Sequence, residues 1–470
     1  MDLDVTTALS GRAGLAGVQW LLLGAPAREA LRGALNDMLN HDAILGAMTL
    51  QRAKYKPGRH LTAYYTVEAR QPTSGPQGER HIEVIWKPTG AEDPHGDPAL
   101  WQGMQAEALE LGVSAPFQRL AASIPEWNMY IRVSPLDPDF PQLVRVSEPG
   151  YVRTMLTPDG HAPSGALASD YQIATIRYRP GQRHVLRYDP ADAAETSMAG
   201  VVFAKIYNSD KGARTFDVVT RAADWLTARS AGITTVRPLR YVPADGMLLY
   251  PCVSGTPLSS LLQDPGADSA YSLGLAGTAL KALHQIPTTL LELQPHSFAK
   301  EIKGIVSASE HIHTLLPETG ARIRALLTEA QALHQRLAQE PPAFAYGDFK
   351  ADHLWAMSTG LILIDFDTCY LFDPAIDLGK FLADLHWWYD RYDLPGVEHA
   401  REHFLEGYGA AALPERVARA RLYEVLVLVK STVRRVRLFD ADWEQRTARL
   451  IRTAEGLLRN LQEDTLMRKT

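Results

Sequence analysis

The chain has 470 residues, of which 46% are hydrophobic, and its formal net charge is −6 at pH 7. This composition is typical of a folded protein of two or three domains and excludes a disordered or fibrous chain. The negative net charge argues against a nucleic-acid partner, because binding to a phosphate backbone requires a basic surface.

The chain contains only two cysteines, Cys252 and Cys369, and both stand in apolar surroundings. Neither a disulfide framework nor a zinc site is indicated, which is typical of a reducing compartment. The apolar run at residues 18–23 is too short to span a membrane and does not follow a basic segment. We therefore expect a cytoplasmic protein that does not bind membranes. The oligomeric state stays open, with a homodimer as one option.

The N-terminal half contains an internal repeat. Each copy begins with two alternating runs around a Pro-Gly pair, which predicts a β-hairpin. A third strand ending in a lysine follows, then an amphipathic helix and two further strands. The hairpins are residues 54–65 and 177–188, the third strands 81–87 and 201–205, the helices 98–111 and 214–229, and the last strand pairs end near residues 134 and 254.

Residues 136–168 are rich in proline, aspartate, glycine and serine. This composition predicts a linker between the two copies. No motif that carries chemistry follows the first copy, whereas the second copy continues into a long helical region.

Three short motifs between residues 346 and 377 carry six carboxylates and a histidine. Tyr-Gly-Asp-Phe-Lys-Ala-Asp-His occupies residues 346–353, Leu-Ile-Leu-Ile-Asp-Phe-Asp residues 361–367, and Asp-Pro-Ala-Ile-Asp residues 373–377. The first is too polar for a strand and predicts a loop, while residues 361–364 predict a strand that ends in Asp365. Such a pair of carboxylates suits phosphoryl transfer, which needs one acid to orient a hydroxyl and another to hold a metal.

In their order and spacing these motifs resemble the catalytic core of the aminoglycoside phosphotransferase and choline kinase family, small-molecule relatives of the protein kinases. The resemblance implies an α+β, protein-kinase-like bilobal fold, with an antiparallel-sheet N-lobe and a mostly helical C-lobe. Together with the repeat it predicts a duplicated N-lobe-like domain in front. The expected domains are residues 1–150, an N-lobe-like cap or interface, 169–254, the nucleotide-binding N-lobe, and 255–470, the C-lobe.

The resemblance also assigns roles within the motifs. Asp348 takes the place of the catalytic base, Asp365 that of the metal-binding aspartate, and Asp377 that of the aspartate that braces the catalytic loop. ATP and Mg²⁺ are the implied cofactors, with Mn²⁺ as an alternative. Lys350 either adds positive charge near the transferred phosphoryl group or is a solvated loop lysine.

Two positions depart from the family pattern. Tyr346 replaces the usual histidine, which we expect to affect only packing or hydrogen bonding. His353 replaces the asparagine that serves as a second metal ligand. Imidazole suits Mn²⁺ or Zn²⁺ better than Mg²⁺, so three readings stay open: a working ligand, a phosphate donor, or a damaged metal site.

In the second copy, Lys205 resembles the lysine that grips the α and β phosphates of ATP. The turn with Gly181 would lie over the phosphates. The usual glutamate partner of the lysine is missing. The following helix offers only Asp217 and Asp224, so the pair is either shortened or absent, and Asp224 is the preferred candidate. The strand and hinge that contact adenine would supply Tyr250, Cys252 and Val253.

In the first copy, Lys87 could occupy the position that Lys205 has in the second. Without a C-lobe behind it, the first copy is better interpreted as a cap, an interface or a wall on the substrate side than as a second nucleotide site.

The helical stretch at residues 378–392 is unusually aromatic, and in this family the helices after the catalytic core form the acceptor pocket. Asp384, Trp387 and Trp388 are therefore the candidate acceptor-binding residues, since aromatic rings stack on sugar faces. The alternative is that the tryptophans are packed against neighbouring helices.

The predicted function is ATP-dependent phosphorylation of a hydroxyl group on a small molecule, with a sugar or aminosugar as the first candidate. An aminoglycoside or amino-alcohol kinase is the alternative within the family. A catalytically impaired pseudokinase that serves as a nucleotide-binding scaffold is the competing class, because His353 and the missing glutamate are changes that such proteins carry.

Overall fold

The computed structural model describes residues 4–70, 78–91, 97–157, 171–191, 200–229 and 232–467. The chain divides into two compact units. Unit 1 comprises Met1–Ala213, Leu239–Cys252 and Arg437–Phe439, and unit 2 comprises Arg214–Pro238, Val253–Val436 and Asp440–Thr470. The expected α+β class is confirmed, since antiparallel sheets are accompanied by many helices. No helix in the described ranges is long and apolar enough to cross a membrane.

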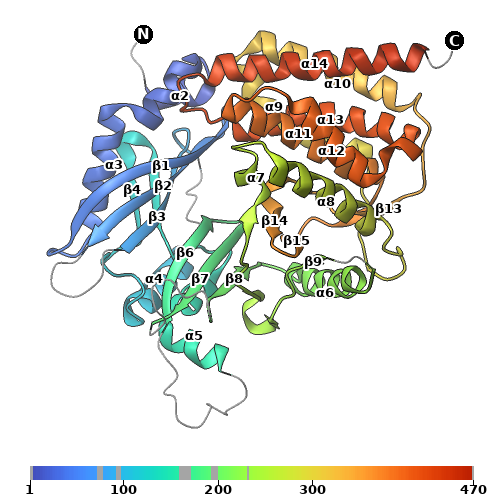
Figure 1. Ribbon diagram of the computed structural model, residues 1–470. Helices are drawn as coiled ribbons and strands as arrows, with labels where there is room; N and C mark the ends of the chain where they lie inside the picture. Colours follow the sequence, from blue (N-terminus) through green and yellow to red (C-terminus); the bar gives the residue numbers. More distant parts are fainter. Residues whose placement is uncertain are drawn as a thin grey trace. The chain divides into compact units, whose positions relative to one another are not determined.

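The first sheet of unit 1 is antiparallel, with strand order β1-β2-β3-β5-β4 (Figure 1). Three N-terminal helices pack on it through apolar residues and through tyrosine hydroxyls: Tyr55 donates to the Leu9 carbonyl at 2.8 Å and Tyr65 to that of Leu22 at 3.4 Å. The elements are α1 (Val5–Ser10), α2 (Gly14–Leu23), α3 (Ala25–Met38), β1 (Ile44–Lys56), β2 (His60–Arg70), β3 (Gly78–Trp86), α4 (Pro98–Glu110), β4 (Ala121–Ile124) and β5 (Met129–Val133).

The second sheet of unit 1 has the strand order β6-β7-β8-β11-β10. Both sheets therefore follow one pattern: a hairpin, a third strand, a helix, and two strands of which the later one pairs with the third strand. The elements are β6 (Tyr171–Arg179), β7 (Arg183–Pro190), β8 (Val202–Ile206), β10 (Arg240–Val242) and β11 (Met247–Pro251), and α6 (Lys211–Arg229) begins in unit 1 and continues in unit 2.

The strand register corrects the expected equivalence of Lys87 and Lys205. In the second sheet, the third residue of β7, Val185, pairs with Lys205. In the first sheet, the third residue of β2, Thr62, pairs with Ile85. Ile85 therefore holds the place of Lys205, while Lys87 lies beyond the end of β3. The first sheet has no ammonium group at this position, which argues against a second nucleotide site of the same kind.

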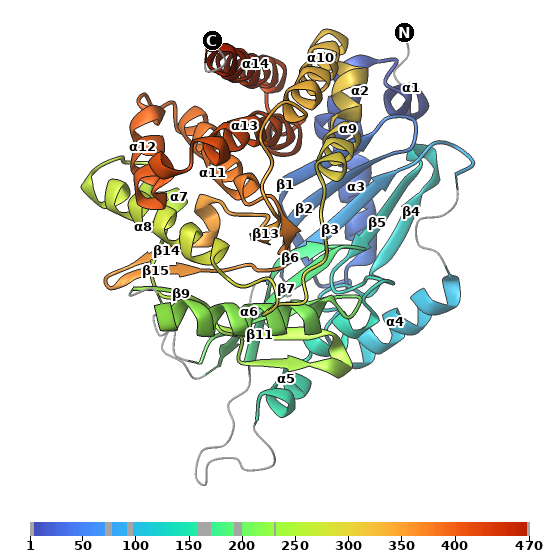
Figure 2. The same cartoon turned by 90° about the vertical axis from the view of Figure 1, so that its right-hand side faces the viewer.

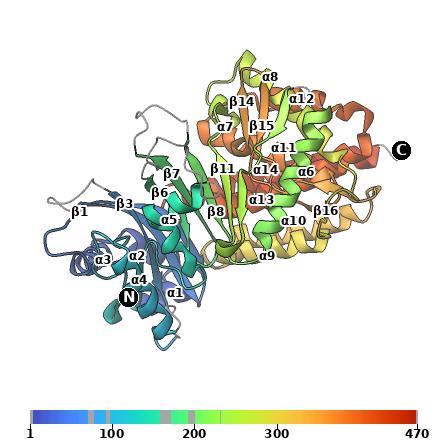
Figure 3. The same cartoon turned by 90° about the horizontal axis from the view of Figure 1, so that it is seen from below.

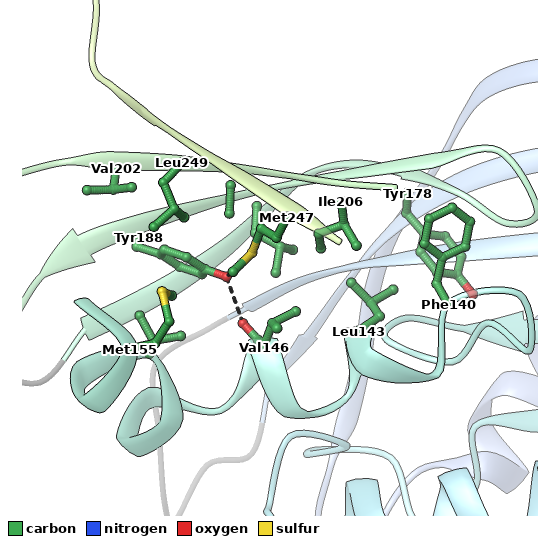
Figure 4. Packing of buried hydrophobic residues seen from close by; sticks show 13 residues of the cluster. Phe140, Leu143, Val146, Met155, Tyr178, Tyr188, Val202, Ile206, Met247 and Leu249 are labelled. Atoms are coloured by element: carbon green, nitrogen blue, oxygen red, sulfur yellow. Dashed lines mark hydrogen bonds between the residues drawn. The ribbon is translucent and has the colours of Figure 1, made fainter. Parts of the chain in front are cut away.

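Residues 136–157 are not the open linker that their composition predicts. They form two 3₁₀ turns, Pro141–Leu143 and Arg145–Ser147, and the helix α5 (Pro149–Leu156). Their apolar side chains pack on one face of the second sheet (Figure 4), where the Tyr188 hydroxyl donates to the Val146 carbonyl at 2.9 Å. Residues 158–170, the rest of the predicted linker, lie outside the described residues. The physical reason for the difference is that phenylalanine, leucine, valine and methionine recur among the polar residues and cover the sheet. The buried members of this layer are Phe140, Leu143, Val146, Val152 and Met155.

Unit 2 contains a small sheet with strand order β12-β14-β15-β9 (Figure 2). The hairpin of β14 and β15 lies at its centre, and β9 pairs with β15 in parallel. A separate pair, β13 with β16, brackets the first two carboxylate motifs, and the third follows β16 directly. The strands are β9 (Ile233–Thr235), β12 (Thr256–Pro257), β13 (Ala343–Ala345), β14 (Leu354–Met357), β15 (Gly360–Leu363) and β16 (Tyr370–Phe372).

Helices make up most of unit 2, and α9, α10, α13 and α14 lie side by side (Figure 3). The central helix α13 carries Arg419, which is 1% exposed. Its guanidinium binds the carboxylates of Asp373 and Glu340 and the carbonyl of Ala338. The helices are α7 (Leu258–Leu261), α8 (Ala267–His284), α9 (Phe298–Leu315), α10 (Pro317–His334), α11 (Ala375–Tyr392), α12 (Val397–Tyr408), α13 (Pro414–Arg435) and α14 (Trp443–Met467).

Candidate active site

The loop between β13 and the 3₁₀ turn at Ala351–His353 presents Asp348, and Asp377 fixes its start. The backbone N–H groups of Tyr346 and Gly347 donate to the two oxygens of Asp377, each at 2.7 Å. Asp377 is fully buried in the first turn of α11. Gly347 has φ +80°, and a Cβ there would stand 2.5 Å from the Thr368 carbonyl oxygen, so the loop requires glycine at this position.

His284 supports this arrangement from α8. Its Nε2 lies 3.2 Å from Oδ2 of Asp377, and its Nδ1 lies 2.8 Å from the Tyr408 hydroxyl. The side chain is 3% exposed. His284 is thus a buried residue whose two ring nitrogens are both paired, and it orients the carboxylate that holds the loop.

Two lysines bind the carboxylate of Asp348. Lys350 Nζ lies 2.8 Å from Oδ2, and Lys380 Nζ lies 3.1 Å from Oδ1. Burial by itself would raise the pKa of Asp348, but the charges of Lys380, Lys350 and His353 hold it well below its usual value. Asp348 is therefore ionised at neutral pH and is a weak base.

Lys380 is a site residue that the sequence reasoning missed. It lies on α11 three residues after Asp377 and four before Asp384, so these residues share one helix face. The sequence therefore contains a signal for Lys380, because a lysine stands between two carboxylates on the helix face that holds the loop. Burial lowers the pKa of Lys380, and the neighbouring charge of Asp348 opposes that shift.

Asp365 follows the β14–β15 hairpin, as the sequence predicted. Its backbone φ is +69°, a left-handed conformation that few non-glycine residues adopt. Its Oδ2 lies 3.5 Å from Nε2 of His353, whose Nδ1 lies 3.1 Å from the Asp348 carbonyl oxygen. The structure therefore brings Asp348, His353 and Asp365 together at one edge of unit 2.

The donors present fit a kinase metal only in part. Among the described residues no group of three or more histidine, cysteine, aspartate or glutamate side chains could hold a metal ion. Asp365 and His353 offer one carboxylate and one imidazole, while both oxygens of Asp348 are bound to lysines. Kinase metals usually take one or two protein carboxylates and complete their shell with nucleotide phosphates and water.

Tyr346 has both of the roles we expected for this replacement. It is fully buried, packs edge-on against Phe366 with ring centroids 4.9 Å apart, and its hydroxyl donates to the Ile364 carbonyl. Tyr346 therefore ties the loop of Asp348 to the strand end that presents Asp365.

The three candidate acceptor residues on α11 have different environments. Asp384 is 2% exposed and accepts hydrogen bonds from the Ala351 N–H at 2.8 Å and from Trp388 at 3.1 Å. Its other oxygen pairs with Arg435 at 2.7 Å. Trp387 is 4% exposed, and the guanidinium groups of Arg435 and Arg446 lie over its ring, 5.4 Å and 4.6 Å from the centroid.

These contacts favour packing roles for two of the three. Both oxygens of Asp384 are already bound to protein groups, one of them the N–H of Ala351 after the loop of Asp348, and Trp387 is buried. Trp388 is half-buried and stacks on Tyr392 with ring centroids 5.4 Å apart, so it stays a candidate for contact with an acceptor.

In unit 1, Lys205 lies on β8 and is 9% exposed. Val202, Ala204 and Ile206 face the apolar layer of residues 136–157, so the alternation of the strand places Lys205 on the opposite face. Gly181 lies in the turn between β6 and β7 with φ +70°.

The predicted hinge residues are all half-buried. Tyr250 lies on β11, and the Cys252 N–H donates to the Val201 carbonyl at 3.2 Å, which keeps the chain beside β8. Val253 is the first residue of this stretch that belongs to unit 2.

Asp224 is an exposed residue of α6 and pairs with Arg237. Asp217, the other acidic residue of this helix, pairs with Arg221 at 2.7 Å. Both carboxylates therefore have arginine partners within unit 2.

A scan against family models matches residues 193–423 to the phosphotransferase enzyme family. The match confirms the family expected from the motifs and, with it, the expected class of enzyme, a phosphotransferase. It includes β8, the catalytic loop, the β14–β15 hairpin and α11. No curated protein matches the chain.

Solved structures with a similar arrangement have low identity. A thermostable mutant of aminoglycoside phosphotransferase APH(4)-Ia is 14% identical over 62% of this chain and 95% of its own, with a TM-score of 0.44. An ethanolamine kinase from Plasmodium vivax is 10% identical over 62% and 84%, with a TM-score of 0.42. A choline/ethanolamine kinase family protein from Mesorhizobium loti is 15% identical over 59% and 88%, with a TM-score of 0.38. Likenesses at this level do not identify a substrate.

Proposed function

Because residues 193–423 match the phosphotransferase enzyme family, we propose that this protein transfers the γ-phosphate of ATP to a hydroxyl group of a small sugar-like molecule. The observation that carries the proposal is the loop of Asp348. Asp377 fixes its start, and the hairpin behind it presents Asp365 and His353 beside Asp348. Phosphoryl transfer depends mainly on such positioning and on charge stabilisation.

On the nucleotide side, we assign the α and β phosphates of ATP to Lys205 and the covering turn to Pro180 and Gly181. The face of the second sheet that carries Lys205 supports this assignment, because the other face is filled by residues 136–157. Tyr250, Cys252 and Val253 would contact the base.

For the metal, Asp365 would be the main ligand and His353 a second one. The metal would neutralise the charge that develops on the phosphates. One imidazole beside one carboxylate favours Mn²⁺ more than the oxygen-only set of the family does. We therefore expect activity with Mg²⁺ and relatively more of it with Mn²⁺.

The low pKa of Asp348 limits its capacity to accept a proton from the acceptor hydroxyl. A carboxylate held by two ammonium groups takes up a proton poorly, so its main contribution is to accept a hydrogen bond from the acceptor hydroxyl and orient it for in-line attack. Lys350 and Lys380 add positive charge where the phosphoryl group is transferred.

The same lysines bear on the choice of acceptor. A cationic acceptor, such as an aminoglycoside or an amino alcohol, would bring an ammonium group toward Lys350 and Lys380 and would be repelled. A neutral polyol would not, and the half-buried ring of Trp388 offers a surface for a sugar face. We propose a neutral sugar as the acceptor. An aminosugar, the other candidate expected from the sequence, carries an ammonium group and is disfavoured by the same repulsion.

The test is a measurement of ADP release by the purified protein with ATP and either Mg²⁺ or Mn²⁺. Sugars, aminosugars, aminoglycosides and amino alcohols are added one at a time. ADP release that depends on a sugar and is abolished by Asp348→Asn would support the proposal. Release that depends on a cationic acceptor would overturn the assignment of the acceptor. Nucleotide binding without phosphorylation of any acceptor would favour the pseudokinase scaffold.

A further inference from the structure

We propose that Asp137 is a positioning residue for the turn of Pro180 and Gly181, and that its carboxylate sets the height of this turn over the nucleotide. The inference rests on the proposed function, which assigns the turn to the phosphates of ATP. All of the groups that carry it belong to unit 1.

Asp137 lies beneath the turn and binds it directly. The Gly181 N–H donates to Oδ2 of Asp137 at 2.9 Å, and Nε2 of His184 lies 2.7 Å from the same oxygen. The other oxygen accepts from the N–H of Asp139 at 3.1 Å. One carboxylate therefore joins the strand β7, the turn and the segment that follows the first sheet.

The pair of Asp137 and His184 is out of contact with water, since both side chains are fully buried. Phe140 packs edge-on against the His184 ring, and the Tyr178 hydroxyl donates to the Leu136 carbonyl. Buried hydrogen bonds that involve a charged group are costly to break, so the turn is held in one place.

A turn between two strands, held only by its own hairpin, opens on fast timescales, and binding of a nucleotide would have to order it. Here that ordering is complete before ATP arrives. The anchoring also defines the part that Gly181 plays. Its N–H is bound to Asp137 and is not a phosphate donor, so glycine is favoured here for its positive φ.

The test compares three variants of the full-length protein. Asp137→Asn keeps the size of the side chain but replaces the carboxylate by one neutral amide oxygen. The bonds to Gly181, His184 and Asp139 cannot all persist, and those that remain are weaker. Asp139→Asn changes an exposed neighbour in the same segment. Leu143→Ala removes a buried residue of the apolar layer without touching the hydrogen bonds. Affinity for a non-hydrolysable ATP analogue is measured by titration, and kcat and the KM for ATP by ADP release.

We expect Asp137→Asn to weaken analogue binding and raise the KM for ATP roughly tenfold, the usual effect of losing a hydrogen bond to a charged group, with kcat at saturating ATP changed less than about twofold. Asp139→Asn should bind like the unaltered protein. Leu143→Ala should melt at a lower temperature and keep its KM, because loss of stability alone does not move the turn. Equal KM values for Asp137→Asn and Leu143→Ala would overturn the inference.

The outcomes also separate this inference from the proposed function. If the unaltered protein binds no ATP analogue, both fail. If it binds the analogue and Asp137→Asn binds it equally well, only the inference fails. If Asp137→Asn does not fold, amide hydrogen exchange in the unaltered protein decides: slow exchange at Gly181 without nucleotide is expected, and fast exchange would contradict the anchoring.

Discussion

Replacement of Asp377 tests whether the carboxylate in α11 is what places Asp348. Asp377→Ala leaves two backbone N–H groups without their acceptors, that of Tyr346, which is fully buried, and that of Gly347, which is half-buried. Each unpaired buried donor costs about 1–3 kcal/mol, so we expect a loss of about 4 kcal/mol in the free energy of unfolding. For a unit of this size that corresponds to a fall of about 10 °C in Tm. Asp377→Asn can still accept one of the two bonds and should lose about half as much.

The effect on turnover should exceed the effect on stability. A displacement of the loop by about 1 Å is enough to cost roughly a hundredfold in rate, because the acceptor hydroxyl is no longer in line. The assay is ADP release at temperatures well below Tm, with thermal unfolding measured in parallel. Asp393→Asn, at the other end of α11 and exposed, is the matched control and should change neither quantity. A folded Asp377→Asn variant with unaltered kcat would refute the reasoning.

Three further substitutions test the charges of unit 2. Lys380→Met should lower kcat at least roughly tenfold, since it removes a cation at the transferred phosphoryl group, and it should leave ATP affinity nearly unchanged. Arg419→Met leaves the buried carboxylate of Asp373 without its partner and should lower the free energy of unfolding in urea by about 3–5 kcal/mol. Glu301→Gln should change the acid stability: burial would raise the pKa of Glu301, but His296 and Lys430 lower it to about 2. Because the folded-state pKa of Glu301 lies below its unfolded value near 4.5, the ionised side chain stabilises the folded protein above pH 4.5. This contribution, about 3 kcal/mol in all, is lost as the pH falls toward 2. The variant should lack this dependence of the free energy of unfolding on pH.

Each of these variants has a control with a defined outcome. Lys350→Met removes the other lysine that binds Asp348, which is exposed to a similar extent (19% against 17%), and it should lower kcat by a similar factor. Arg421→Met breaks a surface ion pair with Asp464 and should cost less than about 1 kcal/mol. Glu318→Gln, on the exposed start of α10, should keep the acid slope of the unaltered protein. Equal urea midpoints for Arg419→Met and Arg421→Met, or an unchanged acid slope in Glu301→Gln, would contradict the assigned contacts.

The catalytic motifs were predictable because they are local in sequence. The loop at Tyr346, the strand that ends at Asp365 and the first turn of α11 each follow from short patterns, and the structure brings them together as expected. Lys380 was not predicted, although its spacing from Asp377 places it on the same helix face. Its contact with Asp348 depends on how the helix meets the loop, which spacing alone does not determine.

Residues 136–157 form a packed segment that local composition did not predict, and the physical reason differs from that for Lys380. The proline and aspartate content of the segment indicated a linker, but Leu143 and Val146 bury their side chains on a sheet that begins more than twenty residues later. Tertiary burial of this kind outweighs local composition. The likeness of the two five-stranded sheets was visible as a repeat, yet only the strand register showed that Ile85, and not Lys87, stands in the place of Lys205.

The central claim is that Asp348 directs a phosphoryl group from ATP to a hydroxyl of a sugar-like acceptor. The most direct measurement is the mass spectrum of the acceptor after incubation with ATP, divalent metal and either the unaltered protein or Asp348→Asn. We predict that the acceptor gains the mass of one phosphoryl group with the unaltered protein and gains none with the variant, although the variant still binds nucleotide. Equal phosphorylation by both proteins would contradict the role of Asp348, and an unchanged acceptor in the presence of bound ATP would contradict the claim that the protein is a sugar kinase.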